Sequence, residues 1–104
     1  MFITETHAFF RSRKGLLDHV ELEKLKAALL INPETGVVIP GSKGLRKMRW
    51  AAKGHGKRGG ARVIYYLRTS NGEILLLMAY AKNEREDLDQ GEIKLLRQLV
   101  EELQ

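Results

Sequence analysis

The chain contains no cysteine among its 104 residues and only two prolines. The lack of cysteine excludes disulfides and thiolate metal sites and is compatible with a reducing compartment. Long hydrophobic runs are also missing. The first residues, MFITETHAFFRSRKG, contain no segment typical of a signal peptide or a membrane-spanning helix. We therefore expect a cytoplasmic protein without membrane contact, and a length that suits one domain, residues 1–104.

Acidic residues are absent from the middle of the chain, where neither Asp nor Glu occurs between Glu34 and Glu73. This interval holds half of the 18 Lys and Arg residues, namely Lys43, Arg46, Lys47, Arg49, Lys53, Lys57, Arg58, Arg62 and Arg68. With a net charge of +5, such a basic run would attract a polyanion. The cations fall on strand-like and glycine-rich sequence and not on an amphipathic helix, so nucleic acid is favoured over a membrane surface.

Hydrophobic periodicity and turn residues predict the elements of an α+β domain. Strands are expected at Phe2–Glu5, at Leu45–Ala51, at Ala61–Thr69 and at Glu73–Lys82, the last two joined by a hairpin turn. Helices are expected at Thr6–Lys14, from the cap Asp18 to Asn32, and from the cap Asp89 onward, with capping boxes closed by Glu21 and Glu92. The order β-α-α-β-β-β-α predicts helices packed against a mainly antiparallel sheet, with a connection at Asn32–Gly44.

Alternation along the three long strands predicts one basic face of the sheet, because residues two positions apart share a face. The apolar set is assigned to the core: Met48, Trp50, Val63, Tyr65, Leu67, Leu75, Leu77, Ala79 and Ala81. The opposite face then carries Lys47, Arg49, Arg62, Tyr66, Tyr80 and Lys82. A single β-bulge would invert this assignment for the residues beyond it.

The glycine-rich stretch KGHGKRGG matches the letters of a dinucleotide-binding fingerprint, but it leads into a strand and not into a helix, which excludes that function. We expect its glycines to let Lys53, Lys57 and Arg58 approach a phosphate backbone. His55 lies inside this basic loop and titrates near neutrality, which makes it a candidate acid–base group. The three histidines lack metal-ligand spacing, so no metal site is expected.

The segment YAKNEREDL follows the last strand and leads into the last helix. Glu86 and Asp89 are expected to be acids of the helix N-terminus, where the helix dipole favours negative charge. Tyr80 and Lys82 are instead assigned to function, because alternation places them on the basic face.

Together, GLRKMRWAAKGHGKRGGARVIYY and YAKNEREDL resemble the RelE/HigB-type toxins of bacterial toxin–antitoxin systems, most closely the HigB-like branch. The resemblance covers most of the chain. It implies a RelE-like fold, a curved and mainly antiparallel sheet with two N-terminal helices and one C-terminal helix. It also implies a ribosome-dependent endoribonuclease without a cofactor that cuts mRNA in the ribosomal A site. The implied partner is a cognate antitoxin, usually a helix-turn-helix protein in the HigB branch.

By this resemblance, Lys47 and Arg49 match two basic residues on the strand before the loop, and Arg62 matches the arginine that opens the next strand. The chain departs from the family pattern at Asn83, where an arginine is usual, and near Asp89, where a tyrosine is usual. Candidate replacements are Tyr80, Lys82, Lys53, Lys57 and Arg58.

The implied chemistry needs one proton acceptor, one proton donor and cations around the scissile phosphate. We expect Arg62 and Arg49 to hold the phosphate, Lys53 or Lys57 to act as the base, and Tyr80 or Lys82 to act as the acid or to position the substrate. The predicted catalytic set is Lys53, Lys57, Arg62, Tyr80 and Lys82. The predicted RNA-binding set is Lys47, Arg49, His55, Arg58, Tyr66 and Asn83.

Two alternative functions fit the same sequence. The first is a non-catalytic module that binds RNA or the ribosome through the basic sheet. The second is a toxin of the same fold with another target, such as gyrase.

Overall fold

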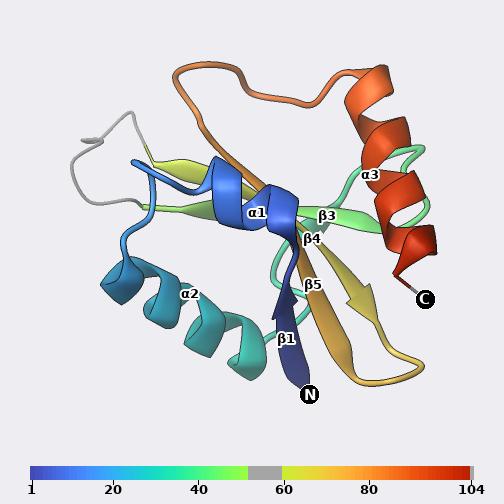
Figure 1. The fold of residues 1–104 in the computed structure, drawn as a ribbon, viewed down its shortest axis with the longest axis horizontal. Coiled ribbons are helices and arrows are strands. Elements are labelled where there is room, and N and C mark those ends of the chain that lie inside the picture. The colour runs from blue at the N-terminus through green and yellow to red at the C-terminus, as the bar shows by residue number, and fades with distance from the viewer. Residues whose placement is uncertain (52–59, 104) are drawn as a thin grey trace.

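The computed structural model describes residues 1–51 and 60–103, whose elements follow the predicted order with one addition (Figure 1). The predicted strands are β1 (Phe2–Glu5), β3 (Leu45–Trp50), β4 (Ala61–Arg68) and β5 (Glu73–Ala81). The predicted helices are α1 (His7–Ser12), α2 (His19–Ile31) and α3 (Gln90–Glu102). The addition is β2 (Val37–Val38), a two-residue strand inside the connection expected at Asn32–Gly44.

The strands of the described residues form one sheet in the order β1-β5-β4-β3-β2. The strand β1 pairs in parallel with β5, whereas β5, β4, β3 and β2 pair in antiparallel fashion. This confirms the predicted α+β class, and it places β1 at an edge of the sheet. The strand β4 is central, so its side chains have neighbours on two strands.

Side-chain caps fix where the helices begin. Asp89 and Glu92 form the complete capping box predicted for α3. Asp18 caps α2 by accepting from the Glu21 amide at 2.8 Å, but the predicted box there is only half formed. The Glu21 carboxylate instead accepts from Trp50 Nε1 at 2.9 Å, because a partly buried indole N–H needs an acceptor. This bond ties α2 to β3.

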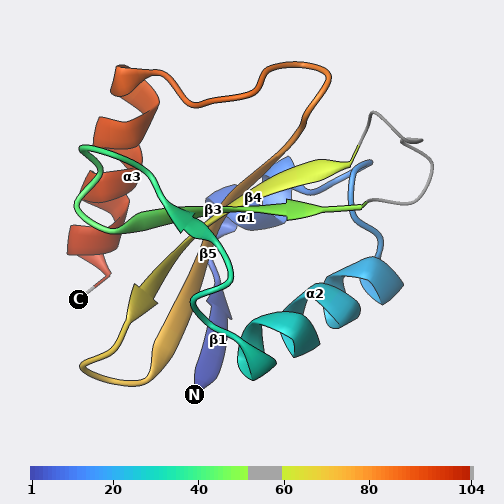
Figure 2. The same ribbon diagram turned by 180° about the vertical axis from the view of Figure 1, so that it is seen from behind.

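The helices pack on opposite faces of the sheet (Figures 1 and 2). One core cluster joins α1 and α2 to the strands through Phe9, Leu25 and Leu29. A second cluster joins α3 to the other face through Ile93, Leu96 and Val100, which meet Leu45, Ile64 and Leu75. The second face is therefore not the purely basic surface expected from the sequence, because α3 covers an apolar part of it.

A β-bulge in β5 explains one error of the sequence analysis. Ile64 pairs with Met78 and Tyr65 pairs with Leu76, so Leu77 has no partner on β4. The extra residue shifts the alternation. Leu75 and Leu77 therefore face α3 and not the α1–α2 core, whereas Ala79, beyond the bulge, faces the α1–α2 core as predicted.

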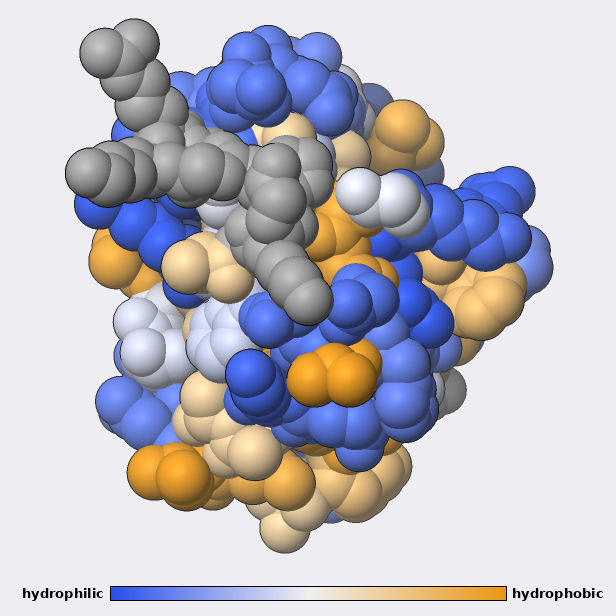
Figure 3. Space-filling model, turned by 90° about the vertical axis from the view of Figure 1, so that its left-hand side faces the viewer, coloured by the Kyte–Doolittle hydropathy of each residue, from blue (hydrophilic) through white to orange (hydrophobic). Residues whose placement is uncertain are grey.

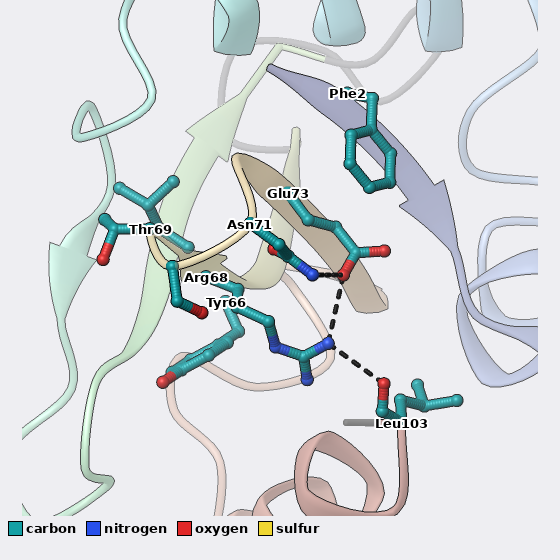
Figure 4. A pocket seen from close by; sticks show the side chains of 9 residues that line it. Phe2, Tyr66, Arg68, Thr69, Asn71, Glu73 and Leu103 are labelled. Atoms are coloured by element: carbon teal, nitrogen blue, oxygen red, sulfur yellow. Dashed lines mark hydrogen bonds and ion pairs between the residues drawn. The ribbon is translucent and has the colours of Figure 1, made fainter.

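Arg68 is buried at the last position of β4, whereas Arg62 lies near the first. Figure 4 shows the Arg68 side chain with its partners Glu73 and Leu103. Its Nη1 donates to Glu73 Oε1 at 3.0 Å and to the Leu103 carbonyl at 3.0 Å, and its Nη2 donates to the Val100 carbonyl at 2.9 Å. These bonds satisfy carbonyls at the end of α3 that have no helical partner. Arg68 is thus a structural residue, although the charge count placed it in the polyanion-binding run.

The face shown in Figure 3 is a mosaic of hydrophilic and hydrophobic residues, as on most folded proteins. In the part of the chain that the structure describes, no helix has the length and apolar character needed to cross a bilayer.

We predict that Arg68→Met lowers the free energy of unfolding by about 3–5 kcal/mol, because it leaves the Glu73 carboxylate buried without its cation. Urea unfolding followed by circular dichroism measures this loss. Arg11→Met is the control: Arg11 is exposed on α1, so its replacement should cost less than about 0.5 kcal/mol. A loss below about 1 kcal/mol for Arg68→Met would show that the pair is dispensable.

Candidate nucleic-acid interface

A row of three predicted site residues crosses the sheet at the first positions of β4. Arg62 pairs with Arg49 of β3 on one side and with Tyr80 of β5 on the other. Residues in direct register share a face and lie side by side. Lys47, two positions before Arg49, extends the same face in the neighbouring row, where it pairs with Ile64. The alternation argument therefore placed these four residues correctly.

The guanidinium of Arg62 lies beneath the surface, with a side chain that is 3% exposed. Its Nη2 lies 3.4 Å from Glu86 Oε1, and its Nη1 makes a long contact of 3.5 Å with the Ala61 carbonyl. Its Nε is buried without a partner among the described residues. Arg62 therefore retains donor capacity toward an anion.

The segment between β5 and α3, residues 82–89, leads from the end of β5 to the start of α3 (Figure 1), and its residues bond to this row. Tyr80 Oη donates to the Glu86 carbonyl at 2.9 Å. Lys47 Nζ donates to the same carbonyl at 3.4 Å and to Asp87 Oδ1 at 2.5 Å. The basic row is thus paired with acidic side chains and with a backbone carbonyl of this segment.

Glu86 was expected to be an acid of the α3 N-terminus, and that expectation is wrong. The helix begins at Gln90 with Asp89 as its cap, so Glu86 lies before the helix and contacts Arg62 and Lys47. Only the cap role of Asp89 is confirmed. Glu84, Glu86 and Asp87 follow β5 closely in the sequence, which could have indicated this contact, but the sequence does not determine how the segment turns back.

Arg85 is a further neighbour of the row that the sequence analysis missed. Its guanidinium carbon lies 4.9 Å from the centre of the Tyr80 ring, and its Nη1 pairs with Glu92 of α3. The cation over the ring holds the aromatic side chain against the segment. Arg85 therefore adds a positive charge beside Tyr80 in a chain that has Asn83 where the family pattern has an arginine.

Tyr80 is a proton donor at neutral pH. Burial is the main cause that raises the pKa of Tyr80 from 10.0 to about 12, and the nearby Asp87 carboxylate adds to it. The hydroxyl therefore stays protonated throughout the physiological range. This suits a group that donates a hydrogen bond or a proton, and it argues against Tyr80 as a base.

Three other predicted residues lie apart from the row. Tyr66 is on the predicted face but packs with the α3 cluster, and the guanidinium carbon of Arg97 lies 5.4 Å from its ring centre. Lys82 and Asn83 follow the end of β5 and are exposed. The Lys82 amide donates to the Gly60 carbonyl at 3.1 Å, which keeps its backbone beside the start of β4.

Four predicted residues, Lys53, His55, Lys57 and Arg58, lie outside the described residues, so their roles stay predictions. The remainder of the basic run is not gathered on one surface. Arg46 faces away from the row and donates to the Gly36 carbonyl at 2.8 Å. Within residues 1–51 and 60–103, no group of three or more metal-ligating side chains comes together.

A pocket of about 560 Å³ lies beside Arg68 and Glu73 and not at the row (Figure 4). The charged groups that line it bond to one another and to α3. We therefore place the candidate site at the Arg49–Arg62–Tyr80 row, where the cations meet exposed acidic side chains.

The shifted ionisation of Tyr80 predicts a loss of stability in alkali. Because the pKa of Tyr80 is higher in the folded protein than in the unfolded chain, the protonated hydroxyl stabilises the fold fully below the unfolded value of 10.0. This stabilisation is lost as the pH rises toward about 12. Between about pH 8 and about pH 10.5, the wild type should lose about 1 kcal/mol more unfolding free energy than Tyr80→Phe does. Urea unfolding of both proteins at the two pH values measures the difference, and parallel losses would contradict it.

Comparison with known families points to one group of proteins. A family model described as the RelE toxin of the RelE / RelB toxin-antitoxin system matches residues 39–104. The matched region includes β3, β4, β5 and α3, and so it contains the Arg49–Arg62–Tyr80 row and the segment that pairs with it.

The fold has a counterpart among solved structures. A mutant of E. coli toxin RelE in the free state is similar with a TM-score of 0.54, and the match covers 75% of this chain and 79% of that chain at 13% sequence identity. This likeness confirms the predicted RelE-like fold. Because the family model matches more than half of the sequence, the chain belongs to the RelE toxin family.

Proposed function

We propose that this protein is a ribosome-dependent endoribonuclease that cuts mRNA in the ribosomal A site and thereby inhibits translation. The row of Arg49, Arg62 and Tyr80, in a member of the RelE toxin family, is the observation that carries the proposal. Two guanidinium groups beside a hydroxyl donor suit a phosphate that gains negative charge during a reaction.

RNA supplies the nucleophile of the proposed reaction. The 2′-oxygen forms a bond to the adjacent phosphorus as the bond from phosphorus to the 5′-oxygen breaks. A base takes the proton of the 2′-hydroxyl, and an acid protonates the leaving 5′-oxygen. The products are a 2′,3′-cyclic phosphate and a 5′-hydroxyl. Cations around the phosphate can stabilise the dianionic intermediate, so the proposed mechanism needs no metal and no other cofactor.

Each described residue has a role that fits its chemistry. Arg62 and Arg49 hold the scissile phosphate, because a planar guanidinium matches two phosphate oxygens. Tyr80 is favoured over Lys82 as the acid, since it stands in register with Arg62 and carries its proton at neutral pH. Lys47 binds the RNA backbone from the neighbouring row.

The remaining predicted residues keep the roles proposed from the sequence. Lys53 or Lys57 acts as the base. His55, Arg58, Tyr66 and Asn83 contribute to RNA binding. The chain acts as one domain in the cytoplasm. A cognate antitoxin neutralises it, and if the chain belongs to the HigB-like branch, that antitoxin is a helix-turn-helix protein.

We predict that Arg62→Ala lowers the rate of mRNA cleavage by about 100-fold or more, because the phosphate loses the guanidinium at the centre of the row. Primer extension on a reporter mRNA, with and without translating ribosomes, measures cleavage by purified protein. Circular dichroism checks that the variant folds. Arg11→Ala, which removes an exposed arginine of α1, serves as the control and should cut like the wild type.

The same assay separates the alternative functions. Discrete cuts only with ribosomes support the proposal, and cuts on free RNA would indicate an autonomous nuclease. If the wild type makes no cuts under either condition, the protein is a non-catalytic binder or acts on another target. A fully active Arg62→Ala protein would remove Arg62 from the mechanism.

A further inference from the structure

The residue that the proposed function assigns to the scissile phosphate is covered. The Arg62 side chain is 3% exposed, and the side chain that pairs with it, Glu86, comes from the segment between β5 and α3. RNA phosphates lie on the outside of a bulky chain, so they cannot reach a guanidinium at this depth. Some part of the cover must move before Arg62 can bind RNA.

Residues 83–88, which we name the anionic strap, bond to three members of the basic face, Lys47, Arg62 and Tyr80. The backbone carbonyl of Glu86 accepts from Tyr80 Oη at 2.9 Å and from Lys47 Nζ at 3.4 Å. Its carboxylate reaches Arg62, and the Asp87 carboxylate reaches Lys47. The oxygens of the strap therefore occupy the acceptor positions around the donors that an RNA phosphate would need.

The contact between Arg62 and Glu86 leaves hydrogen-bond donors of the guanidinium unused. A carboxylate or phosphate in ideal geometry engages a guanidinium through two parallel N–H bonds. Here one Nη2 contact of 3.4 Å is made, and Nε stays buried without a partner among the residues that the structure describes. An RNA phosphate has two non-bridging oxygens that can engage two guanidinium nitrogens together, so it can take the place of the Glu86 carboxylate at Arg62.

The strap is anchored by Leu88, which packs on the α3 core, and by Arg85, which contacts Tyr80 and Glu92, whereas its two carboxylates at the site are held weakly. The side chains of Glu86 and Asp87 are 48% and 73% exposed, so water screens both carboxylates, and a surface ion pair such as Lys47–Asp87 contributes about 0–1 kcal/mol. The strap contains no helix or strand. The capping box of Asp89 and Glu92 closes the start of α3, and Glu92 also accepts from Arg85 of the strap. Glu86 and Asp87 can therefore move away from the site while Arg85 and the helix stay in place.

We infer that the anionic strap holds the free toxin in a closed state, with Glu86 and Asp87 in the place of an RNA phosphate, and that an RNA backbone opens the site by displacing them. This inference rests on the proposed function, because it concerns the regulation of the same site. The apparent affinity for RNA then equals the affinity of the open form multiplied by the fraction of molecules whose site is open.

The test compares two double variants that change the net charge equally. Glu86→Gln with Asp87→Asn removes both carboxylates of the strap that touch the site. Glu84→Gln with Glu102→Gln is the matched control, because both side chains are exposed and neither makes an ion pair within the described part of the chain. The probe is a fluorescent single-stranded RNA with 2′-O-methyl groups, which lacks the nucleophile and cannot be cut.

Fluorescence anisotropy should show that the strap variant binds this RNA roughly tenfold more tightly than the wild type does. The control variant should bind much like the wild type. Adding Arg62→Ala to the strap variant should abolish the gain. Equal affinities for the strap variant and the control would overturn the inference.

Labelling of arginine by phenylglyoxal, read by mass spectrometry, tests the opening without RNA. In the wild type, the buried Arg62 should react more slowly than the exposed Arg49, and in the strap variant the rate at Arg62 should rise. An unchanged labelling rate at Arg62 would overturn the inference that the strap covers this residue.

Faster labelling without tighter RNA binding would overturn RNA as the displacing ligand and would count against the proposed function. Ribosome-dependent cleavage by the wild type, combined with a strap variant that behaves like the control, would leave the function standing and reject the strap.

Discussion

A buried positive charge on the central strand requires an anion beside it, and the structure meets this requirement twice along β4. At the end of the strand, Arg68 is enclosed by Glu73 and the last carbonyls of α3, and both side chains of that ion pair are about a tenth exposed. Near the start, Arg62 pairs with Glu86, which is about half exposed and belongs to a loop. The first arrangement is structural, and the second can be exchanged for an external anion.

The division of the sheet face by α3 makes this difference possible. The helix covers the apolar middle of the face, where Ile64 meets Leu75 and Ile93. The bulge at Leu77 directs additional apolar side chains of β5 toward the same helix. The Arg49–Arg62–Tyr80 row lies at the edge of this core, to which Tyr80 belongs, and there a loop and not a helix provides the cover. A loop held by weak ion pairs can yield to a ligand at small cost in stability.

The sequence predicts the features that depend on local order. Alternation with a period of two placed Arg49, Arg62 and Tyr80 on one face, and that face is observed because no bulge interrupts these parts of the strands. The bulge at Leu77 depends on the pairing partner, so the pattern within β5 did not predict it. The very short β2 has too few residues to produce a periodic signal.

Long-range partners account for the remaining differences. The charge run does not reveal that Arg46 and Arg68 bond to carbonyls from other elements, and Glu86 was assigned to the dipole of a helix that begins four residues later.

The measurement that tests the central claim most directly is a crystal structure of the protein with 2′-O-methyl RNA bound. The account predicts phosphate oxygens against Arg62 and Arg49, with Glu86 moved away from Arg62. RNA bound elsewhere, with Glu86 still paired to Arg62, would contradict it.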